Sequence, residues 1–252
     1  MEETPQNNRI RPEVQGQPGS PMGRLPKQLR DWRVLAGAAA VVIALAAGLH
    51  FATGPESSAA AKTAGGAGKV AEWPDDYTMG DPKAPVQVIE YHSLTCPHCA
   101  HFDETSLPQI KKTYIDTGKV RYISRAFPLN AIDVSAFMVA RCIDRAHYFD
   151  AVSLIYRRQP QWLKPDQEND VIMNALADVM REAGMSRAQF EQCLKSTETL
   201  QRLRKDQLDG EENFRVNSTP TFVINGEVQT GDMTFANFQK AVDPVLAKAG
   251  KP

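Results

Sequence analysis

The stretch that most constrains the fold is an alternating run of residues that leads directly into two cysteines three positions apart. Residues 86–91 alternate and are rich in β-branched side chains, which predicts a strand. Thr95 is an acceptable N-cap, and Pro97 stands where the first turn of a helix tolerates proline. We therefore expect Cys96 and Cys99 to share one face of that first turn, a spacing that suits a reversible disulfide or a metal site.

The start of a helix favours redox chemistry at this pair. The first backbone N–H groups of a helix have no partner within the helix, and the helix dipole places partial positive charge there. A thiolate on Cys96 is stabilised by both effects, so we expect its pKa to lie below that of a free thiol. A protonated His98 would lower the pKa further. A low pKa makes Cys96 a good leaving group and makes its disulfide with Cys99 easy to reduce, hence oxidising.

The alternative for the same cysteines is a zinc site completed by His92, His98 or His101. Structural zinc usually takes four ligands, often supplied as two separated pairs. The remaining cysteines, Cys142 and Cys193, are single and lack that pairing. The sequence therefore favours redox chemistry that uses no metal and no organic cofactor, and we expect His92 and His101 to be surface histidines.

These features resemble the DsbA family, thioredoxin-fold thiol oxidases of the bacterial envelope. The Cys-Pro-His-Cys quartet at 96–99 matches the family as it stands, and so does Glu90, six residues before the first cysteine. Thr219 and Pro220, ahead of an apolar run, match as well. The resemblance covers about residues 77–248 and implies an α/β fold of the thioredoxin type with an inserted α-helical domain.

The resemblance also assigns roles to residues outside the quartet. It implies a cis peptide bond before Pro220, a bend that exposes backbone groups of Thr219 to an extended substrate. Glu90 shares a strand face with Val86 and Val88, so we expect apolar surroundings that raise its pKa and let it relay a proton to or from Cys99. The best-known family members carry valine in place of Thr219, and threonine occurs in isomerase-like and some other oxidase relatives. An isomerase or reductase of the same fold is therefore the alternative function.

Composition divides the chain ahead of this domain. Residues 1–33 are polar and proline-rich, which predicts a disordered segment. Residues 34–49 carry no polar side chain and follow a basic cluster, so we expect 34–53 to be a transmembrane anchor with a cytoplasmic N-terminus, or else a cleaved signal segment. Residues 54–76 are predicted to form a flexible linker to a domain in the periplasm.

The rest of the chain predicts further strands and an inserted block of helices. Pro108 is expected to kink the helix after Cys99, and residues 120–124 predict a second strand, parallel to the first. Ser186 and Gln189 predict a capping box at the start of a later helix. Helical spacing dominates about 131–214, where the cluster of Arg141, Asp144 and Arg145 is expected to be a solvated helix face. Residues 221–229 predict a hairpin with an Asn-Gly turn, and a closing helix follows.

Cys142 and Cys193 are expected on the apolar faces of two helices in the inserted domain. In an oxidising compartment, two buried thiols in contact pair, so we predict a structural disulfide that is remote from Cys96 and harder to reduce than the 96–99 pair. The alternative is two separate core cysteines that pack as small hydrophobes.

Charge and composition complete the prediction. The chain has 29 basic and 30 acidic residues and no basic run interleaved with aromatic residues, so nothing indicates nucleic-acid binding. We predict a monomeric exported oxidoreductase that introduces disulfides into reduced, cysteine-containing proteins, and the resemblance implies reoxidation by a DsbB-like, quinone-linked membrane partner. The alternative from another class is a membrane-tethered zinc-binding or recognition module.

Overall fold

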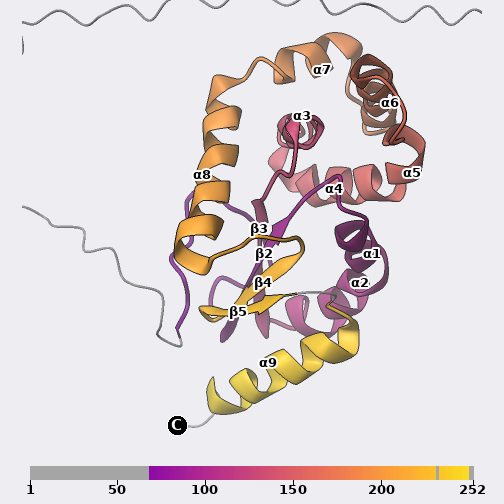
Figure 1. Cartoon of the computed structure of the whole chain (residues 1–252). Helices are drawn as coiled ribbons and strands as arrows, with labels where there is room; N and C mark the ends of the chain where they lie inside the picture. The colour runs from indigo at the N-terminus through magenta and orange to yellow at the C-terminus, as the bar shows by residue number, and fades with distance from the viewer. Residues whose placement is uncertain (1–67, 231–232, 250–252) are drawn as a thin grey trace, which may run out of the picture. The chain divides into compact units, whose positions relative to one another are not determined.

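A mixed five-stranded sheet forms the centre of the region that the structure describes. The computed structural model describes residues 68–230 and 233–249 (Figure 1). The strands lie in the order β1-β3-β2-β4-β5; β2 and β3 are parallel and the other pairings are antiparallel. Their bounds are β1 Tyr77–Met79, β2 Val86–His92, β3 Val120–Ala126, β4 Thr221–Ile224 and β5 Glu227–Thr230. The predicted strands and the predicted parallel pair are confirmed.

Helices follow β2, fill the segment between β3 and β4, and close the chain (Figure 1). After β2 come α1 Pro97–Thr105, α2 Leu107–Ile110 and a π-helical turn Lys111–Ile115. Between β3 and β4 lie α3 Ala131–Ala140, a 3-10 turn Arg145–His147, α4 Tyr148–Arg157, α5 Gln159–Trp162, α6 Asn169–Glu182, α7 Arg187–Cys193 and α8 Thr197–Phe214. The last helix is α9 Phe235–Ala249. The predicted helical insertion is thus present.

One face of the sheet packs against α1 and α9. Val88 of β2 and Phe222 of β4 join Phe102 of α1 and Phe238 of α9 in one buried apolar cluster. All four side chains are at most 1% exposed. This cluster also includes Tyr122, so the face that Glu90 shares with the valines of β2 is apolar, as the alternation predicted.

The opposite face packs against the end of α8. Ile89 and Tyr91 of β2 lie there in a second apolar cluster with Val216, just beyond α8. Gly210 permits the close approach, because a Cβ at this position would stand 3.0 Å from the Tyr91 ring. The inserted helices have an apolar core of their own, in which Trp162 and Leu176 are fully buried.

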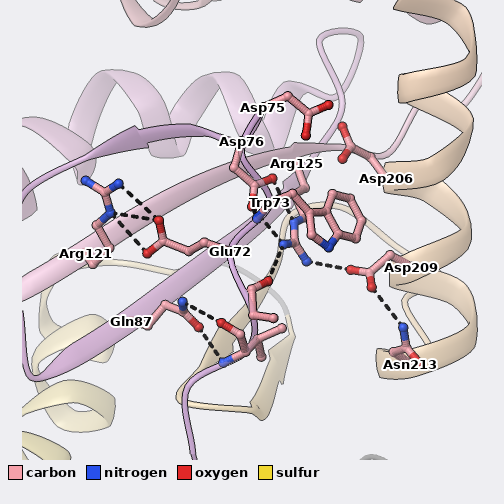
Figure 2. Close-up of polar contacts among 12 residues, drawn as sticks. Glu72, Trp73, Asp75, Asp76, Gln87, Arg121, Arg125, Asp206, Asp209 and Asn213 are labelled. Carbon is pink, nitrogen blue, oxygen red and sulfur yellow. Dashed lines mark hydrogen bonds and ion pairs between the residues drawn. The ribbon is translucent and has the colours of Figure 1, made fainter. Parts of the chain in front are cut away.

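Residues 68–76 pack against the sheet, although the sequence assigned them to the linker that ends at 76. Val70 and the Gln87 side chain exchange two hydrogen bonds, of 2.8 and 2.9 Å. Glu72 pairs with Arg121 of β3 at 3.1 Å. Figure 2 shows both contacts along the strands. The folded part of the described chain therefore begins before Tyr77.

A buried cluster of ion pairs ties this segment to β3 and α8. Arg125 of β3 pairs with Asp76 at 2.9 Å and with Asp209 at 2.7 Å, and its side chain is inaccessible to solvent. The Trp73 ring lies 3.9 Å from the Arg125 guanidinium (Figure 2). Arg202 of α8 adds a bond to Asp76 at 2.7 Å. Each buried charge is therefore paired with an opposite one, as burial requires.

The expected solvated face at Arg141, Asp144 and Arg145 is partly wrong. The Arg141 side chain is only 4% exposed and pairs with buried Asp206 of α8. Arg145, though exposed, donates to backbone oxygens of the 68–76 segment. The partners lie about 65 to 70 positions away in sequence, so no local pattern around residues 141–145 reports them.

Among the described residues, the longest and most apolar helices still fall short of what a membrane span needs. The predicted disordered segment 1–33, the predicted anchor 34–53 and the first part of the predicted linker lie outside those residues.

Candidate active site

The Cys96–Cys99 pair lies where β2 passes through a four-residue loop into α1. Cys96 occupies the N-cap position of α1, and Pro97 is the first helical residue. The predicted N-cap, Thr95, is one residue too early, because Cys96 itself has the extended backbone that precedes the helix. Cys96 is 6% exposed and Cys99 is fully buried, so only the first sulfur is positioned to meet a partner protein.

The surroundings of Cys96 favour its thiolate. The hydrogen bond that the Cys99 thiol donates to the Cys96 sulfur is the largest cause that lowers the pKa of Cys96, to about 5. The Thr219 side chain and the backbone N–H groups of Cys99 and His98 act in the same direction, while burial opposes them. These N–H groups belong to the first turn of α1, as the sequence predicted. The imidazole of His98 is exposed, and its effect on Cys96 stays a prediction.

Cys99 differs from Cys96 in the opposite direction. Burial raises the pKa of Cys99, and the hydrogen bond it donates to Cys96 and the nearby Glu90 raise it further. One cysteine is therefore stabilised as a thiolate while its partner is held as a thiol. This asymmetry assigns the stable anion to the more accessible sulfur.

Glu90 lies on β2 beneath the pair and is 5% exposed. Burial raises the pKa of Glu90 to about 8, with smaller contributions in the same direction from Asp103 and Cys96. The Tyr122 hydroxyl donates a hydrogen bond to a Glu90 carboxyl oxygen, which opposes this rise without cancelling it. At neutral pH the Glu90 carboxyl group is therefore mostly protonated, and it can give a proton to a thiolate or take one back.

The Thr219–Pro220 peptide lies against Cys96 and is cis, as the resemblance implied. The Cys96 sulfur lies 3.3 Å from the Thr219 carbonyl oxygen, to which Cys96 donates when it is protonated. The antiparallel pairing of β4 with β2 places Thr221 opposite Tyr91, near the point where β2 leads toward Cys96. Backbone groups at residue 219 thus border the accessible sulfur.

Three buried side chains of the inserted helices hold the loop at residues 93–96, and sequence reasoning missed all of them. Asp133 of α3 accepts from the Leu94 N–H at 2.8 Å, Tyr156 of α4 donates to the Ser93 carbonyl at 3.1 Å, and Gln159 of α5 donates to the Leu94 carbonyl at 2.9 Å. Their sequence separations from the loop range from 39 to 65 positions. No signal within the loop itself indicates such partners.

His92 is buried at 1% exposure, which corrects its interpretation as a surface histidine. Its two ring nitrogens bond the hydroxyls of Tyr156 and Ser124, each at 2.7 Å. Burial lowers the pKa of His92 to about 3, so the ring stays neutral. His101, by contrast, is exposed, as expected. Among residues 68–230 and 233–249, no group of three or more His, Cys, Asp or Glu side chains is arranged to hold a metal ion.

Cys142 and Cys193 form a disulfide, with Cα atoms 5.9 Å apart. Cys193 ends α7 and is 3% exposed. Cys142 instead lies in the turn after α3 and is exposed, so its placement on an apolar helix face was wrong. The turn after α3 places Cys142 beside Cys193 at the end of α7.

The comparisons with known proteins agree with this architecture. A family model described as thioredoxin matches residues 72–244. A Rickettsia felis protein that carries the name protein-disulfide oxidoreductase is 33% identical over 178 residues, which cover 68% of this chain and 60% of that protein. The Bacillus anthracis protein named as disulfide bond formation protein D is 30% identical, over 68% of this chain and 78% of its own length.

Solved structures show the same likeness. The crystal structure of Wolbachia pipientis α-DsbA1 superposes with a TM-score of 0.65 at 29% identity, covering 71% of this chain and 94% of that one. The chain spans about 60% of the length of the Rickettsia felis relative, so that relative's name does not by itself define the activity here. The matched fold, the Cys-Pro-His-Cys quartet and the cis Pro220 coincide, and the chain belongs to the DsbA family of thioredoxin-like proteins.

Proposed function

We propose that the domain is a thiol–disulfide oxidoreductase that acts as an oxidase, introducing disulfides into exported proteins with reduced cysteines. The observation that carries the proposal is the contrast between the two cysteines. The pKa of Cys96 is lowered to about 5 while that of Cys99 is raised. A stabilised Cys96 thiolate favours the reduced form of the pair, so the disulfide form oxidises its substrates.

The reaction starts from the oxidised pair. A substrate thiolate attacks the Cys96 sulfur, the bond between Cys96 and Cys99 breaks, and Cys99 leaves with the electron pair. Glu90, protonated below its pKa of about 8, supplies a proton to the Cys99 thiolate. The second substrate thiolate then attacks the substrate sulfur of the mixed disulfide and expels Cys96 as a thiolate. The substrate loses two electrons and the enzyme gains them.

Thr219 and Pro220 form the proposed substrate-binding edge. The carbonyl of Thr219 is already within hydrogen-bond distance of Cys96, so an extended peptide bonded to the backbone of residue 219 would present its cysteine to that sulfur. Pro97 and His98 are the first two residues of α1 and directly follow Cys96 at its N-cap.

The cellular setting is part of the same proposal. The apolar segment 34–53 supports an anchor in the inner membrane that holds a monomeric domain in the periplasm. A DsbB-like, quinone-linked membrane oxidase would reoxidise the pair. If the anchor is retained, the mature protein fractionates with membranes and begins near Met1. Soluble mature protein whose first residue lies between positions 54 and 62 would contradict the anchor.

An isomerase is the second candidate, and Thr219 is the residue that favours it. The two functions separate in one experiment with a reduced substrate and a scrambled-disulfide substrate. An oxidase, supplied in its oxidised form, restores activity to the reduced substrate stoichiometrically. An isomerase, supplied reduced, restores the scrambled one. We expect the first result, and we expect Cys96→Ser protein to abolish it.

A further inference from the structure

Buried side chains of the inserted helices bond several backbone groups of the active-site loop. The loop spans residues 93–96, between the end of β2 and the start of α1. Ser93 and Leu94 are both fully buried. A buried loop outside regular structure must find partners for its N–H and C=O groups, because an unpaired buried polar group is costly.

Gln159 of α5 supplies the most direct contact. Its side-chain amide nitrogen donates to the Leu94 carbonyl at 2.9 Å and to the Cys96 carbonyl at 3.3 Å. The same Cys96 carbonyl accepts the first helical bond of α1, from Ala100 at 3.1 Å. One buried amide group therefore reaches both the loop and the residue that carries the accessible sulfur. Gln159 is 8% exposed.

Tyr156 and Asp133 bond the neighbouring groups of the loop. The Tyr156 hydroxyl donates to the Ser93 carbonyl at 3.1 Å, and the Cys96 N–H donates to that carbonyl at 3.2 Å. The Asp133 carboxylate accepts from the Leu94 N–H at 2.8 Å and from the Leu129 N–H at 2.9 Å. Both side chains are buried.

The helices that carry these side chains are themselves fixed. Trp162 of α5 is fully buried and donates from its indole to the Ile155 carbonyl of α4 at 2.9 Å. The Tyr156 hydroxyl also bonds the His92 ring at 2.7 Å, so its position is set from the sheet side as well. Tyr156 and the helix that carries Gln159 thus have partners besides the loop, which favours fixed positions before a substrate arrives.

We propose that Gln159, Tyr156 and Asp133 are positioning residues for thiol–disulfide exchange at Cys96. They fix the backbone of residues 93–96 so that the Cys96 sulfur meets the N–H groups of the first turn of α1 and the carbonyl of Thr219. This role rests on the proposed function and deepens it, because it gives the helical insertion a task in setting the chemistry of the pair. Their hydrogen bonds to the loop go to its backbone groups and not to the two sulfur atoms.

The test compares Gln159→Met with Gln161→Met in the reduced protein. Methionine keeps the length of the side chain and removes the amide donor. Gln161 is an exposed residue on the same short helix, so its variant controls for substitution in α5. In Gln159→Met we expect the pKa of Cys96, measured by thiolate absorbance, to rise. We also expect the equilibrium with glutathione to shift toward the oxidised form by about threefold to tenfold, where tenfold corresponds to a rise of one pKa unit. Gln161→Met should match the unaltered protein in both measurements.

Tyr156→Phe gives a second, independent variant, because it removes the hydroxyl that bonds the Ser93 carbonyl and the His92 ring and keeps the buried aromatic ring. Tyr148→Phe is its control: Tyr148 is a buried tyrosine of the same helix whose hydroxyl bonds Ser124 and not the loop. Tyr156→Phe should change the Cys96 pKa and the glutathione equilibrium in the same direction as Gln159→Met. If Gln159→Met does not fold, Tyr156→Phe decides alone.

If the variants fold and their Cys96 pKa and glutathione equilibrium constant equal those of their controls, the positioning role is overturned. Failure of both variants to fold would overturn it too, because the residues would then act on stability alone. The proposed function fails differently: unaltered protein would not oxidise a reduced substrate, or Cys96→Ser protein would still do so. The two proposals can therefore fail separately.

Discussion

Glu90→Gln should stabilise the folded domain, by an amount that grows with pH. The carboxyl group of Glu90 has an ordinary pKa of 4.5, and burial raises its pKa in the folded protein to about 8. Between these values the folded state keeps a proton that the unfolded state releases. The unfolded state therefore binds fewer protons, and stability falls as pH rises.

The magnitude follows from the size of the shift. Each pKa unit represents about 1.4 kcal/mol, so ionisation of the unfolded state destabilises the native protein by about 3 kcal/mol at pH 7 and about 4 kcal/mol at pH 8, and the difference approaches about 5 kcal/mol at higher pH. Glutamine cannot ionise, and its carbonyl can still accept the bond from Tyr122. Glu90→Gln should thus equal the unaltered protein near pH 4 and exceed it by about 3 kcal/mol at pH 7.

Urea unfolding of the reduced proteins at several pH values measures this difference. Titrations of other groups, Cys96 included, cancel to first order because both proteins share them. The matched control is Glu227→Gln, which makes the same chemical change at an exposed position of β5 and should alter stability by at most about 0.5 kcal/mol at any pH. A stability difference for Glu90→Gln that does not widen between pH 4 and pH 8 would refute a buried, proton-holding Glu90.

Three further predictions follow from the same structure. Replacing Cys142 and Cys193 together by serine should cost up to about 4 kcal/mol of stability, since their bridge closes a loop with a separation of 51 positions; a cost near zero in urea unfolding would deny it a structural role. Asp76→Asn should cost about 3 kcal/mol, because it removes the buried carboxylate that pairs with both Arg125 and Arg202, whereas Asp116→Asn, at an exposed ion pair, should cost about 1 kcal/mol or less; equal costs would contradict the buried cluster. The thiolate of Cys96 should titrate near pH 5, and titration like a free thiol in an absorbance measurement would rule out the stabilising contacts.

The sequence predicted those parts of the fold whose causes lie within a few residues. Ser186 and Gln189 form the predicted capping box of α7, with both reciprocal hydrogen bonds present. Asn225 and Gly226 both have positive φ and connect β4 to β5, as the Asn-Gly turn indicated. The helix after Cys99 is broken at Ser106, two residues before Pro108, where a kink was expected.

The contacts that the sequence did not predict join residues far apart in the chain. Arg141 looked like part of a solvated face because its partner, Asp206, lies 65 positions away. His92 looked like a surface residue because nothing beside it in sequence shows that Tyr156 and Ser124 surround its ring. The helices and strands that pack on a polar side chain decide whether it is buried. A single sequence indicates this only where a periodic pattern of apolar residues marks the buried face.

The candidate site divides in the same way. Its reactive centre was predicted, because a strand, two cysteines and a helix start are contiguous, and the resemblance added Glu90, Thr219 and Pro220. Its supporting residues were not, because Asp133, Tyr156 and Gln159 reach the loop from three different helices. The sequence thus shows the chemistry of the site, and the structure shows what holds it in place.

The reduction potential of the 96–99 pair tests the central claim most directly. The measurement equilibrates the protein with mixtures of reduced and oxidised glutathione and follows the fraction of the pair in each form. A stabilised Cys96 thiolate predicts a strongly oxidising disulfide, with a potential nearer to about −120 mV than to the −270 mV or so of a thioredoxin reductant. A potential at or below about −270 mV would contradict the account and identify the pair as a reductant.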